Sequence, residues 1–274
     1  MQIRVEDLVF DVAADGPADG EPVLLLHGFP QTSWSWRHVT PLLTAAGYRV
    51  LAPDQRGYSP GARPEGRGQY DMPHLLADVL GVLDGAGIDR VHVVGHDWGA
   101  AVAWQLASRH PDRVRTLTAV SVPHPLEFTE ALRHDPDQRR RSQYMLLFKE
   151  VGRAEETLLA DDAAWLRASL GQAGPGGDVE RYVALMSEPG VLTAALNWYR
   201  ATARTDNEGL APVTVPTLYV WSDGDEAVGR TAAEGAARQV AGPYRFVELP
   251  GVSHWIPEQA PAELAALLLE HLRQ

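Results

Sequence analysis

The stretch Val91-His92-Val93-Val94-Gly95-His96-Asp97-Trp98-Gly99 joins a short apolar run to a helical pattern and indicates the fold of the chain. The run before the first glycine predicts a strand buried on both faces, and residues 99–108 have the composition of a helix. Asp97 occupies the centre of the G-x-(nucleophile)-x-G turn between them, where only small residues fit at the flanking positions. We therefore expect Asp97 to be a nucleophile, although an Asp here is also a common helix N-cap.

Outward from this turn, short apolar runs alternate with longer helical patterns, which predicts an α/β fold with a parallel, doubly wound sheet. The strands carry continuous apolar runs and commonly end at glycine or proline, as buried strands do. We expect strands at residues 3–5, 8–12, 22–27, 48–52, 91–94, 114–122, 217–221 and 245–249, and helices at 35–46, 75–83, 99–108 and 261–272.

The alternation stops in the middle of the chain, where the pattern is helical and no strand is evident. We expect residues 1–123 and 212–274 to form the α/β core, and residues 124–211 to form a helical cap, or lid, inserted into it. The glycine-rich segment Gly171–Gly177 predicts a break between cap helices.

The composition excludes several kinds of chemistry. The chain has 274 residues, a formal net charge of −12 and no cysteine, so disulfides, thiolate nucleophiles and cysteine-ligated metals are excluded. Nucleic acid and anionic membrane surfaces attract Lys and Arg, so an acidic chain is a poor partner for either. Without a signal-peptide core or a long apolar span, we expect a cytoplasmic protein that acts on a small molecule as a monomer or homodimer.

An aspartate nucleophile predicts a particular class of substrate. A carboxylate is already ionised at neutral pH, whereas a serine must lose a proton before it attacks. Asp97 can displace a leaving group at a tetrahedral carbon and form an alkyl ester, which water then hydrolyses at the ester carbonyl. The sequence therefore indicates alkylating electrophiles such as epoxides or haloalkanes.

Hydrolysis of such an ester needs a base, and His254 follows the last expected strand, near the carboxyl edge of the sheet. The acid that orients the base should follow another strand, and Asp223, Asp225 and Glu226 all do so. Spacing from the strand favours Asp225, with Asp223 as the alternative. The chain order is then nucleophile, acid and base.

The ester carbonyl also needs two backbone donors for its developing negative charge. One donor is expected from Trp98, which directly follows the nucleophile, and the other from Phe29 in the turn His27-Gly28-Phe29-Pro30. This turn follows an early buried strand, which is the usual place for the second donor.

Taken together, these segments resemble the α/β-hydrolase superfamily and, within it, the soluble epoxide hydrolases. The resemblance spans nearly the whole chain and implies an α/β-hydrolase fold, a helical cap and a cis peptide before Pro30. It also implies that two cap tyrosines, Tyr144 and Tyr199, bind the epoxide oxygen, and that Asp225 is the acid. The segments that carry it are His27-Gly28-Phe29-Pro30, Ser35-Trp36-Arg37, Asp54-Gln55-Arg56-Gly57-Tyr58-Ser59, Gly95-His96-Asp97-Trp98-Gly99, Gly251-Val252-Ser253-His254-Trp255, Tyr144-Met145-Leu146-Leu147-Phe148 and Leu196-Asn197-Trp198-Tyr199-Arg200.

Helical periodicity supports the two tyrosines independently, because each lies on an apolar stripe and is expected to face inward. Tyrosines on such stripes are often plain core packing, which is the competing interpretation. The stripes are Tyr144, Leu147, Phe148 and Val151, and Leu192, Leu196, Tyr199 and Ala203.

The sequence thus predicts an epoxide hydrolase that converts an apolar epoxide to a vicinal diol through an ester on Asp97, without a metal or organic cofactor. We expect the substrate to contact Phe29, Trp98, Met145, Leu147, Phe148 and Trp198. A haloalkane dehalogenase is the first alternative, and it would not need the paired tyrosines. A non-catalytic small-molecule receptor on a hydrolase scaffold is the second.

Overall fold

The computed structural model describes residues 1–174 and 177–274, apart from the side chain of Arg204. Residues 175 and 176, which belong to the expected break at 171–177, lie outside the described residues. The described strands are β1 (Gln2–Val5), β2 (Leu8–Asp15), β3 (Pro22–Leu26), β4 (Arg49–Pro53), β5 (Val91–His96), β6 (Val114–Val120), β7 (Thr217–Ser222) and β8 (Tyr244–Leu249). They form one sheet in the order β1-β2-β4-β3-β5-β6-β7-β8.

The sheet is mostly parallel, as expected. The neighbouring strands β4, β3, β5, β6, β7 and β8 all pair in parallel. At the edge of the sheet, β1 pairs antiparallel with β2, and β2 pairs antiparallel with β4. The chain therefore has the mostly parallel α/β architecture that the alternating pattern predicts.

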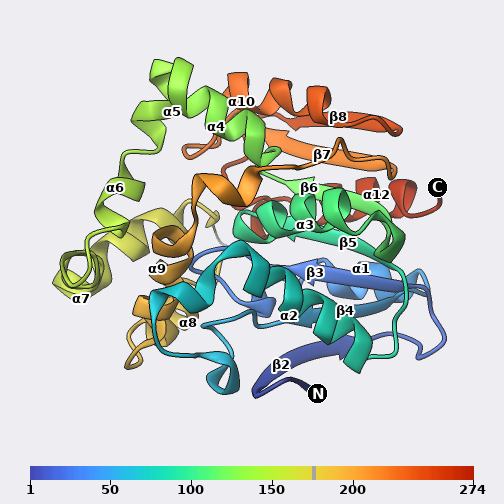
Figure 1. Cartoon of the computed structure of the whole chain (residues 1–274), viewed down its shortest axis with the longest axis horizontal. Helices are drawn as coiled ribbons and strands as arrows, with labels where there is room; N and C mark the ends of the chain where they lie inside the picture. The colour runs from blue at the N-terminus through green and yellow to red at the C-terminus, as the bar shows by residue number, and fades with distance from the viewer. Residues whose placement is uncertain (175–176) are drawn as a thin grey trace.

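Helices cover both faces of this sheet (Figure 1). One face is covered by α2 (Met72–Gly85), α3 (Trp98–Arg109) and α10 (Arg230–Gly235), and the other by α1 (Thr40–Ala45), α11 (Ile256–Gln259) and α12 (Pro261–His271). Single-turn 3-10 elements connect these helices, namely η1 (Ser33–Trp36), η2 (Pro60–Ala62), η3 (Arg67–Tyr70), η4 (Pro111–Arg113), η6 (Arg204–Asn207) and η7 (Ala236–Gln239).

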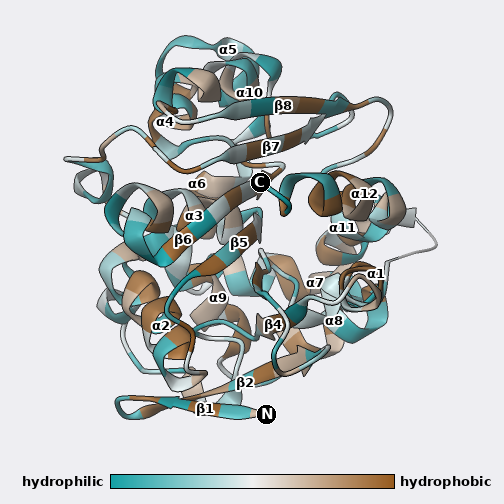
Figure 2. Ribbon diagram, turned by 90° about the vertical axis from the view of Figure 1, so that its right-hand side faces the viewer, coloured by the Kyte–Doolittle hydropathy of each residue, from teal (hydrophilic) through white to brown (hydrophobic). Residues whose placement is uncertain are grey.

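Side chains alternate along β3 between two separate cores. Leu24 and Leu26 pack with the α2 and α3 side, whereas Val23 and Leu25 pack with the α1 and α12 side, and all four are fully buried. Hydrophobic segments accordingly run through the central strands and α2 (Figure 2). Burial on both faces explains why these strands read as continuous apolar runs rather than alternating ones.

Between β6 and β7 the described residues form helices, and these helices gather at one side of the sheet (Figure 1). One of them, α7, contains a break at residues 160–163, where three residues have positive φ. The helices are α4 (Pro125–His134), α5 (Pro136–Arg141), α6 (Tyr144–Phe148), α7 (Arg153–Gly171), α8 (Val179–Met186) and α9 (Val191–Ala201). None of the helices in the described part of the chain is long and apolar enough to cross a membrane.

The expected helix at residues 35–46 is wrong in its extent. The structure has the 3-10 turn η1 and then the short helix α1, which begins at Thr40 with Pro41 in its first turn. Proline lacks a backbone N–H and clashes with the preceding turn, so it is placed at helix starts rather than in helix interiors.

Three glycines allow the backbone around Asp97 to pack closely. A Cβ on Gly95 would lie 2.1 Å from the carbonyl oxygen of Gly99, and a Cβ on Gly99 would lie 2.2 Å from the carbonyl oxygen of Leu26. A Cβ on Gly28 would lie 2.3 Å from the Cβ of Asp97. The carbonyl groups next to Gly95 and Gly99 cannot move aside, and the Asp97 side chain next to Gly28 is held in place, so all three positions exclude a larger residue.

We expect the substitution Gly99→Ala to destabilise the fold, because its new methyl group would overlap the end of β3. The expected loss in the free energy of unfolding is about 2 kcal/mol or more, the cost of overpacking a tight site. Urea unfolding followed by circular dichroism measures it. Gly171→Ala is the control, since no atom of the described residues outside its own helix lies within 4 Å of its Cβ position. Equal stability of the two variants would contradict the steric argument.

Candidate active site

Asp97 lies at the junction of β5 and α3 with a strained backbone. Its φ is 52° and its ψ is −119°, a conformation that non-glycine residues rarely adopt. The carboxylate makes no helix-capping hydrogen bond, and its Oδ1 instead accepts a hydrogen bond of 2.8 Å from the backbone N–H of Phe29. The N-cap interpretation therefore does not describe this side chain, which points to the end of β3.

His254 and Asp225 complete a chain of side chains behind Asp97. The Nε2 atom of His254 lies 3.5 Å from Oδ2 of Asp97, and its Nδ1 atom lies 2.8 Å from Oδ2 of Asp225. Asp225 is fully buried, and its Oδ1 accepts two further hydrogen bonds from backbone N–H groups of its own loop. Asp223, the alternative acid, instead accepts a hydrogen bond from the backbone N–H of Gly251.

The two carboxylates determine the protonation state of the imidazole. Burial by itself lowers the pKa of His254, but Asp225, followed by Asp97, outweighs it and raises this pKa to about 10. Burial likewise raises the pKa of Asp97, but the hydrogen bond and charge of His254 outweigh burial and leave that pKa below its ordinary value. At neutral pH the site therefore holds an aspartate and an imidazolium side by side.

His96, the neighbour of the nucleophile, has a structural position. Its Nε2 lies 2.9 Å from the carbonyl oxygen of His254, which also accepts a hydrogen bond from the hydroxyl of Ser121. Burial, together with the charge of His254, lowers the pKa of His96 to about 4, so its ring is neutral and donates from Nε2. His96 and Ser121 thus hold the backbone that carries the base.

The loop after β3 supplies the donor to Asp97 from the position that the sequence indicates. The peptide bond between Phe29 and Pro30 is cis, as the resemblance implies. His27 lies below the loop and accepts a hydrogen bond from the backbone N–H of Gln55. The backbone N–H of Trp98 also hydrogen-bonds the carboxylate of Asp97 and favours its charged form.

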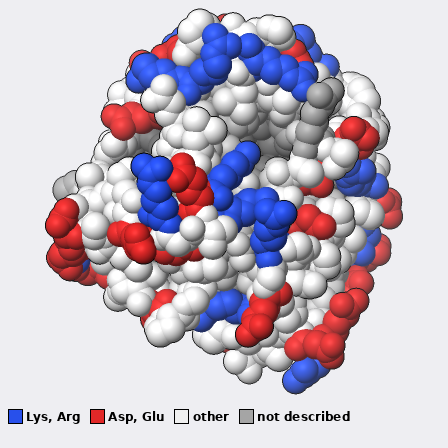
Figure 3. Space-filling model, turned by 60° about the vertical axis from the view of Figure 1, so that its left-hand side comes forward, with Lys and Arg blue, Asp and Glu red and all other residues white. Residues whose placement is uncertain are grey.

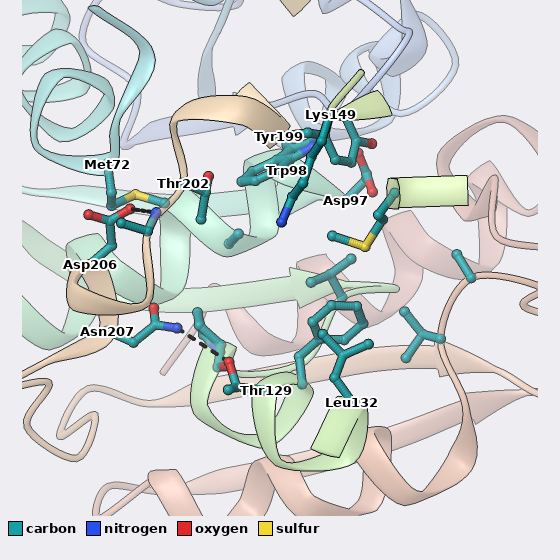
Figure 4. Close-up of a pocket in the computed structure, with 18 of the residues that line it drawn as sticks. Met72, Asp97, Trp98, Thr129, Leu132, Lys149, Tyr199, Thr202, Asp206 and Asn207 are labelled. Carbon is teal, nitrogen blue, oxygen red and sulfur yellow. Dashed lines mark hydrogen bonds between the residues drawn. The ribbon is translucent and has the colours of Figure 1, made fainter. Parts of the chain in front are cut away.

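A cavity in two parts meets at Asp97, and both parts are also lined by Tyr144, Tyr199 and Ala227. The first part, of about 320 Å³, is called the α4 lobe here (Figure 4). The second, of about 310 Å³, is called the α7 lobe. Besides the shared residues, the α4 lobe is lined by Met72, Trp98, Ala101, Val122, Pro125, Phe128, Thr129, Leu132, Met145, Lys149, Thr202, Ala203, Asp206, Asn207 and Val228, and the α7 lobe by Phe29, Pro30, Arg141, Phe148, Trp165, Ala168, Ser169, Gln172, Glu226, His254 and Trp255.

Tyr144 and Tyr199 lie where the lobes meet, and their rings pack among aromatic neighbours. Tyr199 makes edge contacts with Phe29, Phe148 and Trp98 at centroid distances of 5.5, 4.9 and 5.0 Å. Tyr144 lies 6.4 Å from Tyr199, again between ring centroids. Burial raises the pKa of both phenols, and the nearby charge of Asp97 adds to the effect, so both keep their protons at neutral pH.

Four of the six expected substrate contacts line the cavity, and two do not. Trp98 and Met145 line the α4 lobe, and Phe29 and Phe148 line the α7 lobe. Leu147 and Trp198 line neither lobe. The Trp198 indole lies behind Trp98 and donates a hydrogen bond of 2.9 Å to the carbonyl oxygen of Arg56, so it supports the site from outside the cavity.

The apolar stripes are shorter than the periodicity indicates. α6 ends at Phe148, so Val151 lies beyond the helix and is 74% exposed. α9 ends at Ala201, and Ala203 lies beyond it on the surface. The fourth member of each stripe is therefore wrong, whereas Tyr199 is buried and Tyr144 is half-buried.

Most residues of the α4 lobe are not among those that the sequence indicates. Phe128 and Leu132 come from α4, one helical turn apart, and Lys149 follows α6 directly. The spacing of Phe128 and Leu132 is a usable signal for an inward face. Nothing local indicates that this face lines a cavity, because the opposite wall comes from distant parts of the chain.

Comparison with known proteins agrees with this arrangement. The family model described as "alpha/beta hydrolase fold" matches residues 21–261. The chain belongs to the α/β-hydrolase family. Within this family, the chain is similar to epoxide hydrolases. Epoxide hydrolase A of Mycobacterium tuberculosis is 36% identical over 299 residues, with 92% of each chain covered. The AB hydrolase superfamily protein YfhM of Bacillus subtilis is 35% identical, covering 99% of this chain and 96% of its own.

Solved structures extend the likeness to the whole architecture of this α/β-hydrolase. The crystal structure of epoxide hydrolase A from Mycobacterium thermoresistibile has a TM-score of 0.86 at 32% identity and covers 100% of this chain and 97% of its own. The epoxide hydrolase of Bacillus megaterium, solved with an inhibitor, has a TM-score of 0.89 at 26% identity and covers 100% of both chains.

Among residues 1–174 and 177–274, no group of three or more His, Asp or Glu side chains is arranged to hold a metal ion.

We expect His254 to carry a positive charge well above neutral pH, because two carboxylates flank its ring. Nitrogen-15 NMR of labelled histidines should show an imidazolium at His254 at pH 8 and its loss near pH 10. His96 is the internal control and should remain neutral at every pH above about 5, since its pKa is lowered to about 4. A neutral His254 at pH 8 would contradict the ion pair with Asp97.

Proposed function

We propose that this protein is an epoxide hydrolase, which uses water to convert an epoxide to a vicinal diol through an ester on Asp97. One observation carries the proposal, namely that two protonated phenols share a cavity with an ionised aspartate. The carboxylate suits attack on an alkylating carbon, and the phenols suit an oxygen leaving group that stays attached to the substrate. The family relationship supports the same activity.

The two oxygens of Asp97 have different tasks in this proposal. Oδ1 is held by the backbone N–H of Phe29 and becomes the carbonyl oxygen of the ester. Oδ2 faces His254 and the cavity, and it attacks the ring carbon. When water later adds to the ester, negative charge develops on Oδ1, which already accepts a hydrogen bond from the N–H of Phe29, and we assign the N–H of Trp98 as the second donor.

The phenols of Tyr144 and Tyr199 stabilise the alkoxide that forms when the ring opens. Both hydroxyls hydrogen-bond the epoxide oxygen, and one of them transfers its proton. Their pKa values are raised by burial, so they are poor acids towards water. A fully developed alkoxide is a stronger base than a phenolate, which makes the transfer favourable when the carbon–oxygen bond breaks.

The first step prepares the base for the second. In the free protein the negative charge of Asp97 helps to keep His254 protonated. Conversion of Asp97 to an ester removes this charge, so the pKa of His254 falls. The imidazolium then gives its proton to solvent, the tyrosinate left by ring opening takes one back, and His254 becomes a neutral imidazole. His254, oriented by Asp225, then takes a proton from the water that attacks the ester carbonyl.

We assign the remaining walls of the cavity to substrate binding. Trp98, Met145, Phe29 and Phe148 provide apolar and aromatic contacts to the organic part of the epoxide. We also propose that residues 124–211 act as a cap, which shields the ester from bulk water while His254 positions one water molecule.

The phenol assignment predicts slower ring opening in Tyr144→Phe and Tyr199→Phe. Each substitution should lower the single-turnover rate of ester formation about 10- to 100-fold, and the double variant should lose roughly a thousandfold or more. Rapid-quench assays of diol and ester with styrene oxide measure these rates. Tyr244→Phe on β8 is the control and should retain the wild-type rate. Halide release from haloalkanes by an unimpaired double variant would favour a dehalogenase.

The covalent route predicts that His254→Gln traps the ester on Asp97. Intact-protein mass spectrometry should show the protein plus one epoxide, and peptide mapping should place the added mass on Asp97. His134→Gln, at an exposed cap histidine, should accumulate no adduct. Normal diol production by His254→Gln would exclude the two-step scheme.

The protonation states predict different pH profiles for the two steps. Ester formation should be flat between pH 6 and 9, because the lowered pKa of Asp97 keeps it ionised over this whole range. Ester hydrolysis should rise with pH, because it needs neutral His254, and should level off below pH 10 once the charge of Asp97 is lost. Single-turnover experiments at several pH values resolve both steps. A hydrolysis rate that falls as pH rises would contradict the assignment of His254.

A further inference from the structure

The walls of the α4 lobe are mainly apolar, with one cation at the opening. Lys149 is the single lysine in the sequence, and it extends into the lobe from the end of α6 (Figure 4). Opposite walls come from Phe128 and Leu132 of α4 and from Met72. A lysine ammonium is strongly hydrated and carries a full positive charge at neutral pH, so it is an uncommon choice for the wall of an apolar cavity.

The other charged groups of the cavity walls, outside the catalytic residues, have partners. Asp206, in the α4 lobe, accepts a hydrogen bond of 2.9 Å from a backbone N–H, and burial raises the pKa of its carboxyl group. In the α7 lobe, Arg141 forms an ion pair of 2.6 Å within α5, and Glu226 accepts a hydrogen bond of 2.7 Å from a glutamine side chain. Within the described part of the chain, the ammonium of Lys149 makes no hydrogen bond or ion pair.

The surface around the cap is also basic in part. Figure 3 shows a hollow on this face, with a row of Lys and Arg side chains above it over α5, which carries three consecutive arginines at residues 139–141. An exposed cation in the wall of an apolar cavity favours a ligand with an anionic end.

We propose that Lys149 binds an anionic group at the far end of the substrate, so that the preferred substrates are amphipathic epoxides with a carboxylate tail. This inference rests on the proposed function, because it places the epoxide ring at Asp97. The hydrocarbon between the ring and the tail fills the α4 lobe, and the carboxylate meets the ammonium at its opening. The net charge of −12 repels an anionic substrate at long range, but salt screens this repulsion over about 8 Å. The local contact with Lys149 therefore decides the preference for a carboxylate tail.

A matched substrate series tests the charge preference. Terminal epoxides of straight chains that end in a carboxylate, a methyl ester or an ammonium are compared at several chain lengths by kcat/KM. The wild-type protein should prefer the carboxylate to the ester at one optimal length. Lys149→Met should lower this ratio about two- to fivefold, the range expected for a partly exposed ion pair. Lys149→Arg should keep most of the preference, and Lys149→Glu should shift it towards the ammonium.

Arg153→Met is the control, because Arg153 is an exposed cap cation outside both lobes that pairs with Glu150. It should leave the carboxylate-to-ester ratio unchanged. Since every result is a ratio within one variant, a partial folding defect cancels out. A ratio that is the same in wild type, Lys149→Met and Lys149→Glu would overturn the proposal, even if all the epoxides are turned over.

A second measurement does not need turnover. Because Lys149 is the single lysine, acetylation at this side chain can be followed by peptide mass spectrometry. Decanoate, which has no epoxide, should slow acetylation of Lys149, whereas decanol should not. Protection by decanoate without any epoxide turnover would support the anion site and contradict the proposed reaction. Equal acetylation with and without decanoate would overturn the anion site alone.

Discussion

The active site depends on a steric constraint, which is the close approach of backbone segments around Asp97. Gly28, Gly95 and Gly99 each lie where a Cβ would overlap neighbouring atoms at 2.1–2.3 Å. Without side chains at these positions, the end of β3 can lie against the turn between β5 and α3. Asp97 is thereby held at φ 52°, with one oxygen at the N–H of Phe29 and the other towards His254. Strain in the turn is the cost of presenting the carboxylate in this way.

Electrostatics then couples the residues that this turn brings together. One imidazole lies between two buried carboxylates, so the protonated form of His254 is strongly favoured in the free protein. With such a high pKa, His254 would stay protonated and could not accept a proton from water unless its surroundings changed during the reaction. In the proposed mechanism, alkylation of Asp97 removes one of the two charges, so the first step itself makes His254 available for the second. This coupling needs a carboxylate nucleophile, since a serine ester would leave the charge at this position unchanged.

In the proposed function, the helices between β6 and β7 provide the substrate selectivity of the site around Asp97. They place Tyr144 and Tyr199 at the junction of two lobes, and they supply the apolar wall and the single lysine of the α4 lobe. The aromatic packing of Tyr199 against Phe29 and Trp98 joins these helices directly to the loops that hold the nucleophile. Substrate selection and catalysis therefore share contacts in this α/β-hydrolase.

By itself, the sequence determined the fold class and the elbow around Asp97, because strand–turn–helix patterns and glycine sterics are local. The choice of His254 came from the order of residues along the chain, and that of Tyr144 and Tyr199 from the resemblance to epoxide hydrolases. Tertiary structure decided what depends on contacts between distant segments. It brought Asp225, and not Asp223, against His254, although both belong to one loop. It also ended α6 before Val151, and it placed Trp198 behind the cavity and Lys149 at its opening. The direction of a side chain and the walls of a cavity are set by packing partners far along the chain, which periodicity does not contain.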